Sequence, residues 1–70
     1  MPKLAAHITG TVTRIEKSPG DPVAPGEAVV ILESMKMEMP VEAEAAGRVK
    51  EIRCQVGQSV SEGDVLAVIE

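Results

Sequence analysis

The sequence predicts an all-β protein of the sandwich or barrel type, and three observations support this prediction. Short apolar stretches rich in valine and isoleucine alternate with turn-forming glycine, proline, aspartate and serine, at the spacing typical of small β-sandwiches. No window sustains the i, i+3, i+4, i+7 pattern of an amphipathic helix. The third observation is an internal repeat. The apolar stretches cover residues 12–15, 29–32, 49–52 and 65–69.

The repeat aligns residues 10–33 with residues 47–70 without a gap, at a constant offset of 37 positions. It predicts two copies of one β unit that fold together with quasi-twofold symmetry, each copy covering the apolar face of the other. The halves extend from about residue 6 to 33 and from 43 to 70, and residues 34–38 join them within one domain of residues 1–70. Seven of the 24 aligned pairs are identical: Gly10/Gly47, Val12/Val49, Ile15/Ile52, Gly20/Gly57, Val23/Val60, Gly26/Gly63 and Glu33/Glu70.

The first strand of each copy has an irregular spacing of apolar residues. Valine and isoleucine lie three positions apart, at Val12 and Ile15 and again at Val49 and Ile52. Strict alternation along a strand would place the two side chains on opposite faces of the sheet. We therefore expect a matched pair of β-bulges, around residues 13–14 and 50–51, that turns both residues toward the core.

The connections after these strands carry turn chemistry. Residues 19–20 and 25–26 are both Pro-Gly, and Gly57 and Gly63 repeat the two glycines in the second copy. Proline fixes φ and glycine tolerates a positive φ, which is typical of type II turns. We expect a positive φ at all four glycines.

Between the copies, the sequence predicts an exposed β-hairpin. Residues 28–32 form a strand that leaves the core, the chain reverses near Met35 and Lys36, and residues 38–43 return. Pro40 has no amide hydrogen to donate, so the returning strand is expected at the edge of a sheet. The tip of an edge hairpin is a place where a side chain can be offered to another protein.

Composition excludes several classes of protein. The chain has no aromatic residue, so its core must be built from small aliphatic side chains, which favours a thin sandwich over a deep pocket. Cys54 is the only cysteine, so no internal disulfide is possible and a reducing compartment is expected. No apolar run has membrane-spanning length and residues 1–4 are not followed by the apolar region typical of a signal peptide, so we expect a cytoplasmic chain. A net charge of −4 with scattered basic residues argues against nucleic-acid binding.

Most polar candidates are best interpreted as structural or solvated. His7 has no second histidine or nearby cysteine with which to form a metal site. Cys54 occupies the repeat position of Lys17, so we expect a structural thiol that is at least partly exposed. Four glutamates are expected to form a solvated face with a secondary role in partner selection: Glu33, Glu38, Glu42 and Glu44.

Lys36 is the exception, since it lies between Met35 and Met37 at the expected hairpin tip. A lysine in a turn is ordinarily a solvated charge, and alternating methionines ordinarily mark the inward face of a strand. Here the lysine lies where the two copies join, flexible thioethers flank it, and no other group of residues is equipped for chemistry. The pattern therefore predicts an amine that is displayed for use by a partner.

The run ESMKME at residues 33–38, followed by Pro40 and by AGRV at residues 46–49, resembles the biotin-attachment hairpin of biotinyl carrier domains in biotin-dependent carboxylases. The resemblance covers about residue 6 to residue 70. It implies a flattened barrel of two four-stranded antiparallel sheets related by a quasi-dyad. It also implies biotin joined by an amide to Lys36, with Met35 and Met37 as the flanking recognition residues.

The resemblance further implies a non-catalytic carrier of carboxyl groups. Its partners would be a biotin protein ligase, which modifies the lysine, and the biotin carboxylase and carboxyltransferase domains or subunits between which biotin moves. We expect a monomer. Because the first copy aligns to the second without a gap, the inserted thumb of some bacterial acetyl-CoA carboxylase carriers should be absent. A free-standing carrier and an excised part of a longer chain both remain open, as does the identity of the carboxylase.

Two alternatives share the predicted fold. A lipoyl domain displays its lysine at the same turn, but that lysine typically follows an aspartate and precedes a small residue, which Met35 and Met37 do not match. An unmodified interaction domain of the sandwich type is the second alternative. The mass of the intact protein after co-expression with biotin ligase distinguishes the three.

Overall fold

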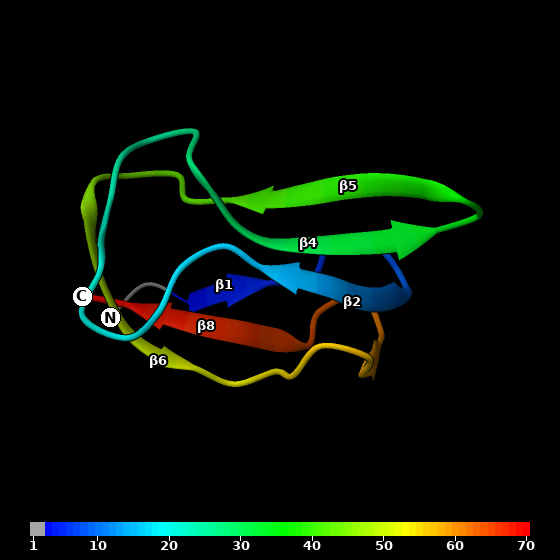
Figure 1. Ribbon diagram of the computed structural model, residues 1–70. Helices are drawn as coiled ribbons and strands as arrows, with labels where there is room; N and C mark the ends of the chain where they lie inside the picture. The colour runs from blue at the N-terminus through cyan, green and yellow to red at the C-terminus, as the bar shows by residue number, and fades with distance from the viewer. Residues whose placement is uncertain (1–2) are drawn as a thin grey trace.

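The structure is a computed structural model that describes residues 3–70 of the chain. In these residues, eight strands form two four-stranded antiparallel sheets that pack as two layers (Figure 1). One sheet has the strand order β1-β8-β6-β3 and the other β5-β4-β2-β7, which confirms the predicted all-β sandwich. The strands are β1 (Lys3–Ala5), β2 (Gly10–Ile15), β3 (Pro22–Val23), β4 (Ala28–Ser34), β5 (Met37–Glu42), β6 (Gly47–Ile52), β7 (Ser59–Val60) and β8 (Val65–Ile69).

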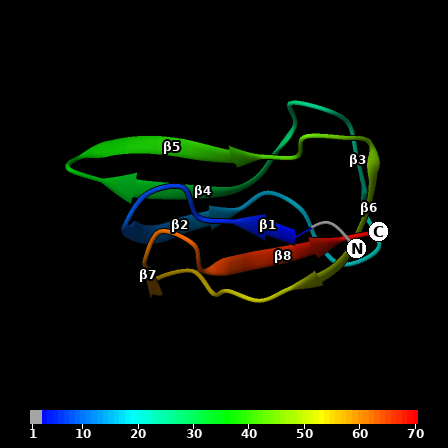
Figure 2. The same cartoon turned by 180° about the vertical axis from the view of Figure 1, so that it is seen from behind.

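The two copies of the repeat are interleaved. β2, β3 and β4 correspond to β6, β7 and β8 at the 37-position offset, and β1 corresponds to the last three residues of β5. Each sheet contains strands of both copies, because β3 pairs with β6 and β7 pairs with β2. Figure 2 shows the same two layers from behind, with β3 and β7 near opposite ends of the molecule. Neither copy can therefore complete a sheet alone.

The predicted β-bulges are present as a matched pair. The register of β2 against β4 shifts between Val12 and Arg14, and the register of β6 against β8 shifts between Val49 and Glu51. Val12 and Val49 are almost completely buried, and the isoleucines at the ends of the two strands pack against the same core. Each extra residue reverses the alternation of side chains once, which lets both apolar residues face inward.

The turn prediction is also confirmed, since all four repeat glycines have φ between 81° and 95°. Gly26 donates its N–H to the carbonyl of Ala43, and Gly63 donates to the carbonyl of Ala6, each across 2.8 Å. These two hydrogen bonds are related by the repeat. Each turn is thereby fastened to the chain just beyond an edge strand, which fixes where β5 and β1 lie.

The core consists of small aliphatic side chains from both sheets. No charged or polar side chain is buried among the described residues. Leucine and valine fill the space between the layers at close to zero exposure, as expected for a sandwich without aromatic residues. The largest fully buried side chains are Leu32, Leu66, Val12, Val29, Val30 and Val49.

The prediction that Cys54 is partly exposed is wrong. Cys54 is only 6% exposed and belongs to the core cluster. Its repeat counterpart, Lys17, is half-buried, and its Nζ lies 2.9 Å from a carboxylate oxygen of Glu27. A long side chain at this position runs outward to solvent, whereas a short thiol ends inside. Burial raises the pKa of the Cys54 thiol, so the reactive thiolate is disfavoured at neutral pH.

The connections between strands have matched lengths in the two copies. Residues 16–21 link β2 to β3, and residues 53–58 link β6 to β7. No loop is inserted in the first copy within the described residues, which confirms the predicted absence of a thumb. The main difference between the copies lies at the hairpin of β4 and β5.

Candidate functional site

The hairpin of β4 and β5 extends beyond the rest of the protein (Figure 1). The two strands pair from Ala28 and Glu42 to Ser34 and Met37, which leaves residues 35 and 36 as a two-residue turn. The neighbouring strand β2 stops pairing with β4 at Glu33. The last rung and the turn therefore depend on the two hairpin strands alone, and both faces of the tip are open to solvent.

The turn has an unusual backbone for the residues that occupy it. Met35 has φ 54° and Lys36 has φ 64°, both in the left-handed region. Two successive positive φ values define a type I′ turn, which matches the twist of the strands and usually carries Asn-Gly. An L side chain in this region costs about 1–2 kcal/mol per residue. A strained conformation at an exposed tip is a reason to look for function there.

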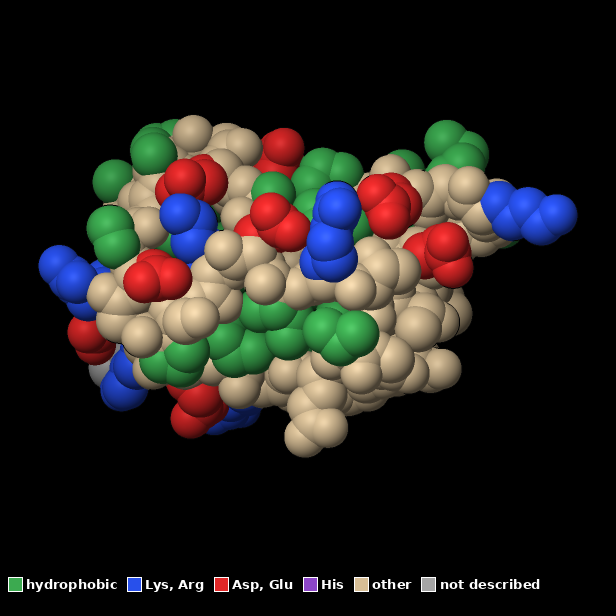
Figure 3. Space-filling view, viewed as in Figure 1, with side chains coloured by type: hydrophobic (Ala, Val, Ile, Leu, Met, Phe, Trp, Pro, Cys, Tyr) green, Lys and Arg blue, Asp and Glu red, His purple; other side chains and the backbone are tan. Residues whose placement is uncertain are grey.

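Both methionines that flank the lysine are exposed. Met35 is 93% exposed and Met37 is 62% exposed, while Met39 is half-buried opposite the fully buried Leu32. The ordinary interpretation, an inward-facing methionine on a strand, thus fits Met39 but not the other two. Figure 3 shows hydrophobic and basic side chains projecting at the tip of the hairpin. Exposed thioethers are costly in water, and they offer a soft, adaptable contact surface to a partner.

The amine of Lys36 is unrestrained in this structure. Lys36 is exposed and forms no ion pair or hydrogen bond with any residue in the range 3–70. Glu38 is the acid that follows the turn most closely on β5, and its Oε1 lies 3.4 Å from Nη2 of Arg14 on β2. Arg14 also holds Glu16, with 3.3 Å between Nε and Oε1. The nearby carboxylate is thus partly neutralised by Arg14, and the lysine keeps its full reach.

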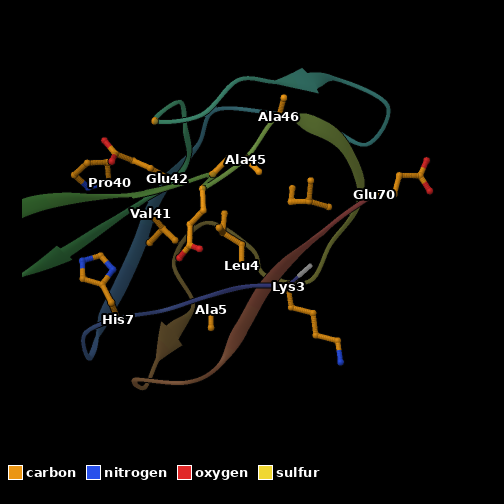
Figure 4. A pocket seen from close by; sticks show the side chains of 14 residues that line it. Lys3, Leu4, Ala5, His7, Pro40, Val41, Glu42, Ala45, Ala46 and Glu70 are labelled. Atoms are coloured by element: carbon orange, nitrogen blue, oxygen red, sulfur yellow. The ribbon is translucent and has the colours of Figure 1, made fainter. Parts of the chain in front are cut away.

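A groove of about 900 Å³ lies elsewhere, between the edge strands β1 and β5. Figure 4 shows Leu4 and Val41 facing this groove, with His7 and Glu42 at its border. Lys36 and its flanking methionines do not line it. The candidate lysine is therefore offered to solvent at a tip and not enclosed in a pocket.

Other kinds of site are not found in the described part of the chain. Residues 3–70 hold no cluster of three histidine, cysteine or acidic side chains that could bind a metal ion. They also contain no helix that is long and apolar enough to cross a membrane. His7 is exposed and has no such cluster around it. The hairpin tip is the best candidate that the geometry offers.

Comparison with known families decides the kind of protein. Residues 1–69 match the family model described as "Biotin-requiring enzyme", which covers biotin and lipoyl attachment domains. The chain belongs to this family. The family resemblance predicted from residues 33–38 is confirmed.

Two small relatives match over most of their length. The Biotinylated protein TB7.3 homolog of Mycobacterium leprae is 44% identical over 64 residues, which cover 91% of this chain and 90% of that protein. The Biotin/lipoyl attachment protein of Bacillus subtilis is 41% identical over 63 residues, which cover 90% of this chain and 86% of that protein. The chain is therefore similar, over most of its length, to two short proteins of this family.

Long carboxylases match as well. The mitochondrial propionyl-CoA carboxylase alpha chain of Homo sapiens is 39% identical over 67 residues, but this chain spans only 9% of that protein's length. Among solved structures, the urea carboxylase of Kluyveromyces lactis has a TM-score of 0.94 at 38% identity, over 99% of this chain and 6% of that chain. A single-chain, multi-domain long-chain acyl-CoA carboxylase has a TM-score of 0.91 at 34% identity, over 97% of this chain and 7% of that chain. The chain is thus homologous to one small part of each carboxylase.

Sequence reasoning located the tip residues but missed two contacts that shape the hairpin. The ion pair of Arg14 with Glu38 crosses β4 and could not be read from local sequence. The close approach of Gly10 to Glu33 was also missed. The available signal for the second contact was the identity of Gly10 and Gly47 in the repeat.

Proposed function

We propose that this chain is a biotin carboxyl carrier in which Lys36 holds biotin through an amide bond to Nζ. The observation that carries the proposal is the exposed Lys36, without an ion pair in residues 3–70, on a strained two-residue turn at the end of an overhanging hairpin. Membership of the attachment family and similarity to a biotinylated protein support it. An amide bond at this nitrogen requires an accessible, uncharged amine, and turn placement provides the access.

Met35 and Met37 are proposed as recognition residues for the biotin protein ligase. Both methionines are adjacent to the acceptor lysine in the sequence and have most of their surface in water. Flexible apolar side chains that become buried in a complex contribute binding energy at little cost in directional fit. The enzyme could thus bind the tip while leaving the amine free to react.

The role of the chain in carboxylation is proposed to be delivery. When bound, biotin supplies the ring nitrogen that takes up a carboxyl group at one active site and releases it at another. The paired strands β4 and β5 hold the attachment point away from the body, and the lysine stem adds reach. A tether of this kind keeps its end group at high effective concentration near both sites. The proposed partners are therefore biotin carboxylase and carboxyltransferase domains, met by a monomeric carrier without catalytic residues of its own.

The test is the intact mass of the protein after co-expression with a biotin protein ligase. We expect a single biotinyl increment on the unchanged chain and none on Lys36→Ala. Lys50→Ala, at an exposed lysine on β6, is the control and should keep the increment. Lys36→Ala should alter the free energy of unfolding by less than about 0.5 kcal/mol, because an exposed turn side chain makes little packing contact.

The same experiment separates the alternatives. A lipoyl increment after co-expression with a lipoate ligase, without biotinylation, would assign the chain to the lipoyl carriers. No increment with either ligase would leave an unmodified interaction domain. Capture of Lys36→Ala by streptavidin would refute the proposed attachment residue while keeping the proposed cofactor.

A further inference from the structure

Strand β2 pairs with the outgoing hairpin strand for the last time at Thr11, next to Gly10. Gly10 is the first residue of β2, and the last β2 to β4 register pair joins Thr11 to Glu33. Beyond this point, Ser34 pairs only with Met37 of the hairpin itself. The place where β4 leaves the body is therefore defined by the contact between Gly10 and Glu33.

That contact leaves no room for a side chain on Gly10. A Cβ there would lie 2.6 Å from the carbonyl oxygen of Glu33 and 3.3 Å from its carbonyl carbon, with Cβ of Ser34 at 3.5 Å. The first distance is well inside van der Waals contact, and the carbonyl belongs to the backbone, so it cannot rotate away as a side chain could. Gly10 is not in the left-handed region, so it is required for space and not for its φ.

A displacement of the β4 backbone at Glu33 would also move the turn that carries Lys36. Glu33 lies three residues before Lys36 and pairs directly with Glu38 on the returning strand. The free part of the hairpin is short and is held together by its own rungs, so pushing β4 outward would move the turn with it. A shift at the base of the hairpin therefore becomes a shift of the acceptor amine.

The second copy provides an internal control. A Cβ on Gly47 would lie 2.7 Å from the carbonyl oxygen of Glu70 and 2.8 Å from Cγ2 of Ile69. The backbone contact matches that of Gly10 and the side-chain contact is an addition, so the cost to folding should be at least as large. The strand that Gly47 touches ends near the C-terminus, which lies at the end of the molecule opposite the hairpin tip (Figure 1). A shift there does not reach Lys36.

We propose that Gly10 is a positioning residue for Lys36: by letting β2 approach the Glu33 carbonyl, it sets the direction in which the hairpin presents the amine to its modifying enzyme. This inference rests on the proposed function, since it concerns the attachment reaction at Lys36. It assigns different roles to two glycines that the repeat makes equivalent. Gly10 serves presentation of the amine, and Gly47 serves the fold alone.

The test compares Gly10→Ala with Gly47→Ala as substrates of a biotin protein ligase. Initial rates are measured against carrier concentration with saturating biotin and ATP, per folded molecule, with sucrose added to favour the folded state. We expect Gly10→Ala to lower kcat/KM by about 10-fold to 100-fold, because a displacement of about 1 Å at a reacting group has effects of that size. Gly47→Ala should stay within about twofold of the unchanged chain, because it lies far from Lys36.

A second measurement separates positioning from chemical availability of the amine. The rate at which a small amine-reactive ester acylates Lys36, followed by peptide mass mapping, should be the same in both variants, because the side chain remains exposed. A loss in Gly10→Ala confined to the enzymatic reaction supports the proposal. A parallel loss with the small ester would show that the amine itself is obstructed and would overturn it.

The remaining outcomes are also decisive. Equal enzymatic rates for the two variants would overturn the role of Gly10 and leave the proposed function intact. Loss of the fold in Gly10→Ala, alone or together with Gly47→Ala, would assign Gly10 to the body of the protein and overturn its proposed role. Failure of the unchanged chain to be biotinylated would instead refute the proposed function, and the inference would fall with it.

Discussion

The two copies of the repeat share their bulges and turns and differ at the β4–β5 hairpin. Both have a bulge after the first valine, both have two glycine turns with positive φ, and both fasten the second turn to an edge strand. In the first copy, β4 and β5 extend past the body and join through a tight turn. In the second, β8 and β1 pair in the same register but are not joined. The shared bulges and turns shape the core. The hairpin occurs in the first copy alone, so it is where a specific function can reside.

A second difference shows how freely the surface chemistry of the copies has diverged. In the first copy, the Lys17 amine bonds the Glu27 carboxylate and, together with the backbone N–H of Ala24, lowers the pKa of that carboxyl group. In the second copy, Cys54 stands in place of the lysine and packs into the core. The backbone of the turn is retained in both, with the N–H of Asp64 donating to the carbonyl of Ser61. The turn backbone and its side-chain cap, in which Glu27 accepts from the N–H of Ala24 and Asp64 from the N–H of Ser61, are therefore common to the copies, and the lysine ion pair is not.

The largest expected loss in the free energy of unfolding comes from substitutions in the core that the two copies share. Leu32→Ala should lower the free energy of unfolding by about 2–5 kcal/mol, because it leaves a cavity at a fully buried site. Ile69→Ala, at the repeat-related position, should have a similar cost, because both side chains belong to one core cluster. Urea unfolding followed by circular dichroism measures both. A biphasic transition in either variant would mean that the halves are separate folding units.

Substitution of a turn glycine should lower the free energy of unfolding by less than a core substitution does, and by the same amount in both copies. Gly26→Val and Gly63→Val should each cost at least about 1–2 kcal/mol, since φ is +81° and +94° at these positions and a β-branched residue is poorly tolerated there. A Cβ at either site meets nothing within 4 Å, so the cost arises from the backbone conformation alone. Thermal unfolding tests the pair. Unchanged midpoints in both variants would contradict the assignment of these turns.

The smallest predicted change is a gain in the free energy of unfolding, and it should occur only at the hairpin. Met35→Asn should stabilise the fold by about 0.5–1 kcal/mol, because asparagine adopts positive φ in type I′ turns more readily than methionine. Met37→Asn, on the strand beside it, is the matched control and should give no such gain. Thermal unfolding of both variants measures the difference. Under the proposed function, Met35→Asn should also slow biotinylation, and a variant both more stable and equally reactive would remove Met35 from the recognition site.

Several structural features could be predicted because they follow from local rules. A spacing of three between Val12 and Ile15 cannot be buried on one face of a regular strand, so a bulge was required. Glycine after proline predicted positive φ because few other residues adopt it. The exposure of Cys54 could not be predicted from its repeat partner. Lys17 and Cys54 share a backbone position, but only the lysine is long enough to reach solvent from it.

The sequence by itself determined the β architecture, the duplication, the turns and the location of one lysine between two methionines. These depend on side-chain period and on the φ preferences of single residues, which act over a few positions. Only the tertiary structure decided how far the hairpin overhangs the body, which acid Arg14 holds, and why Gly10 has no side chain. Each of these depends on the register between strands far apart in the chain, because register determines where one strand ends beside another.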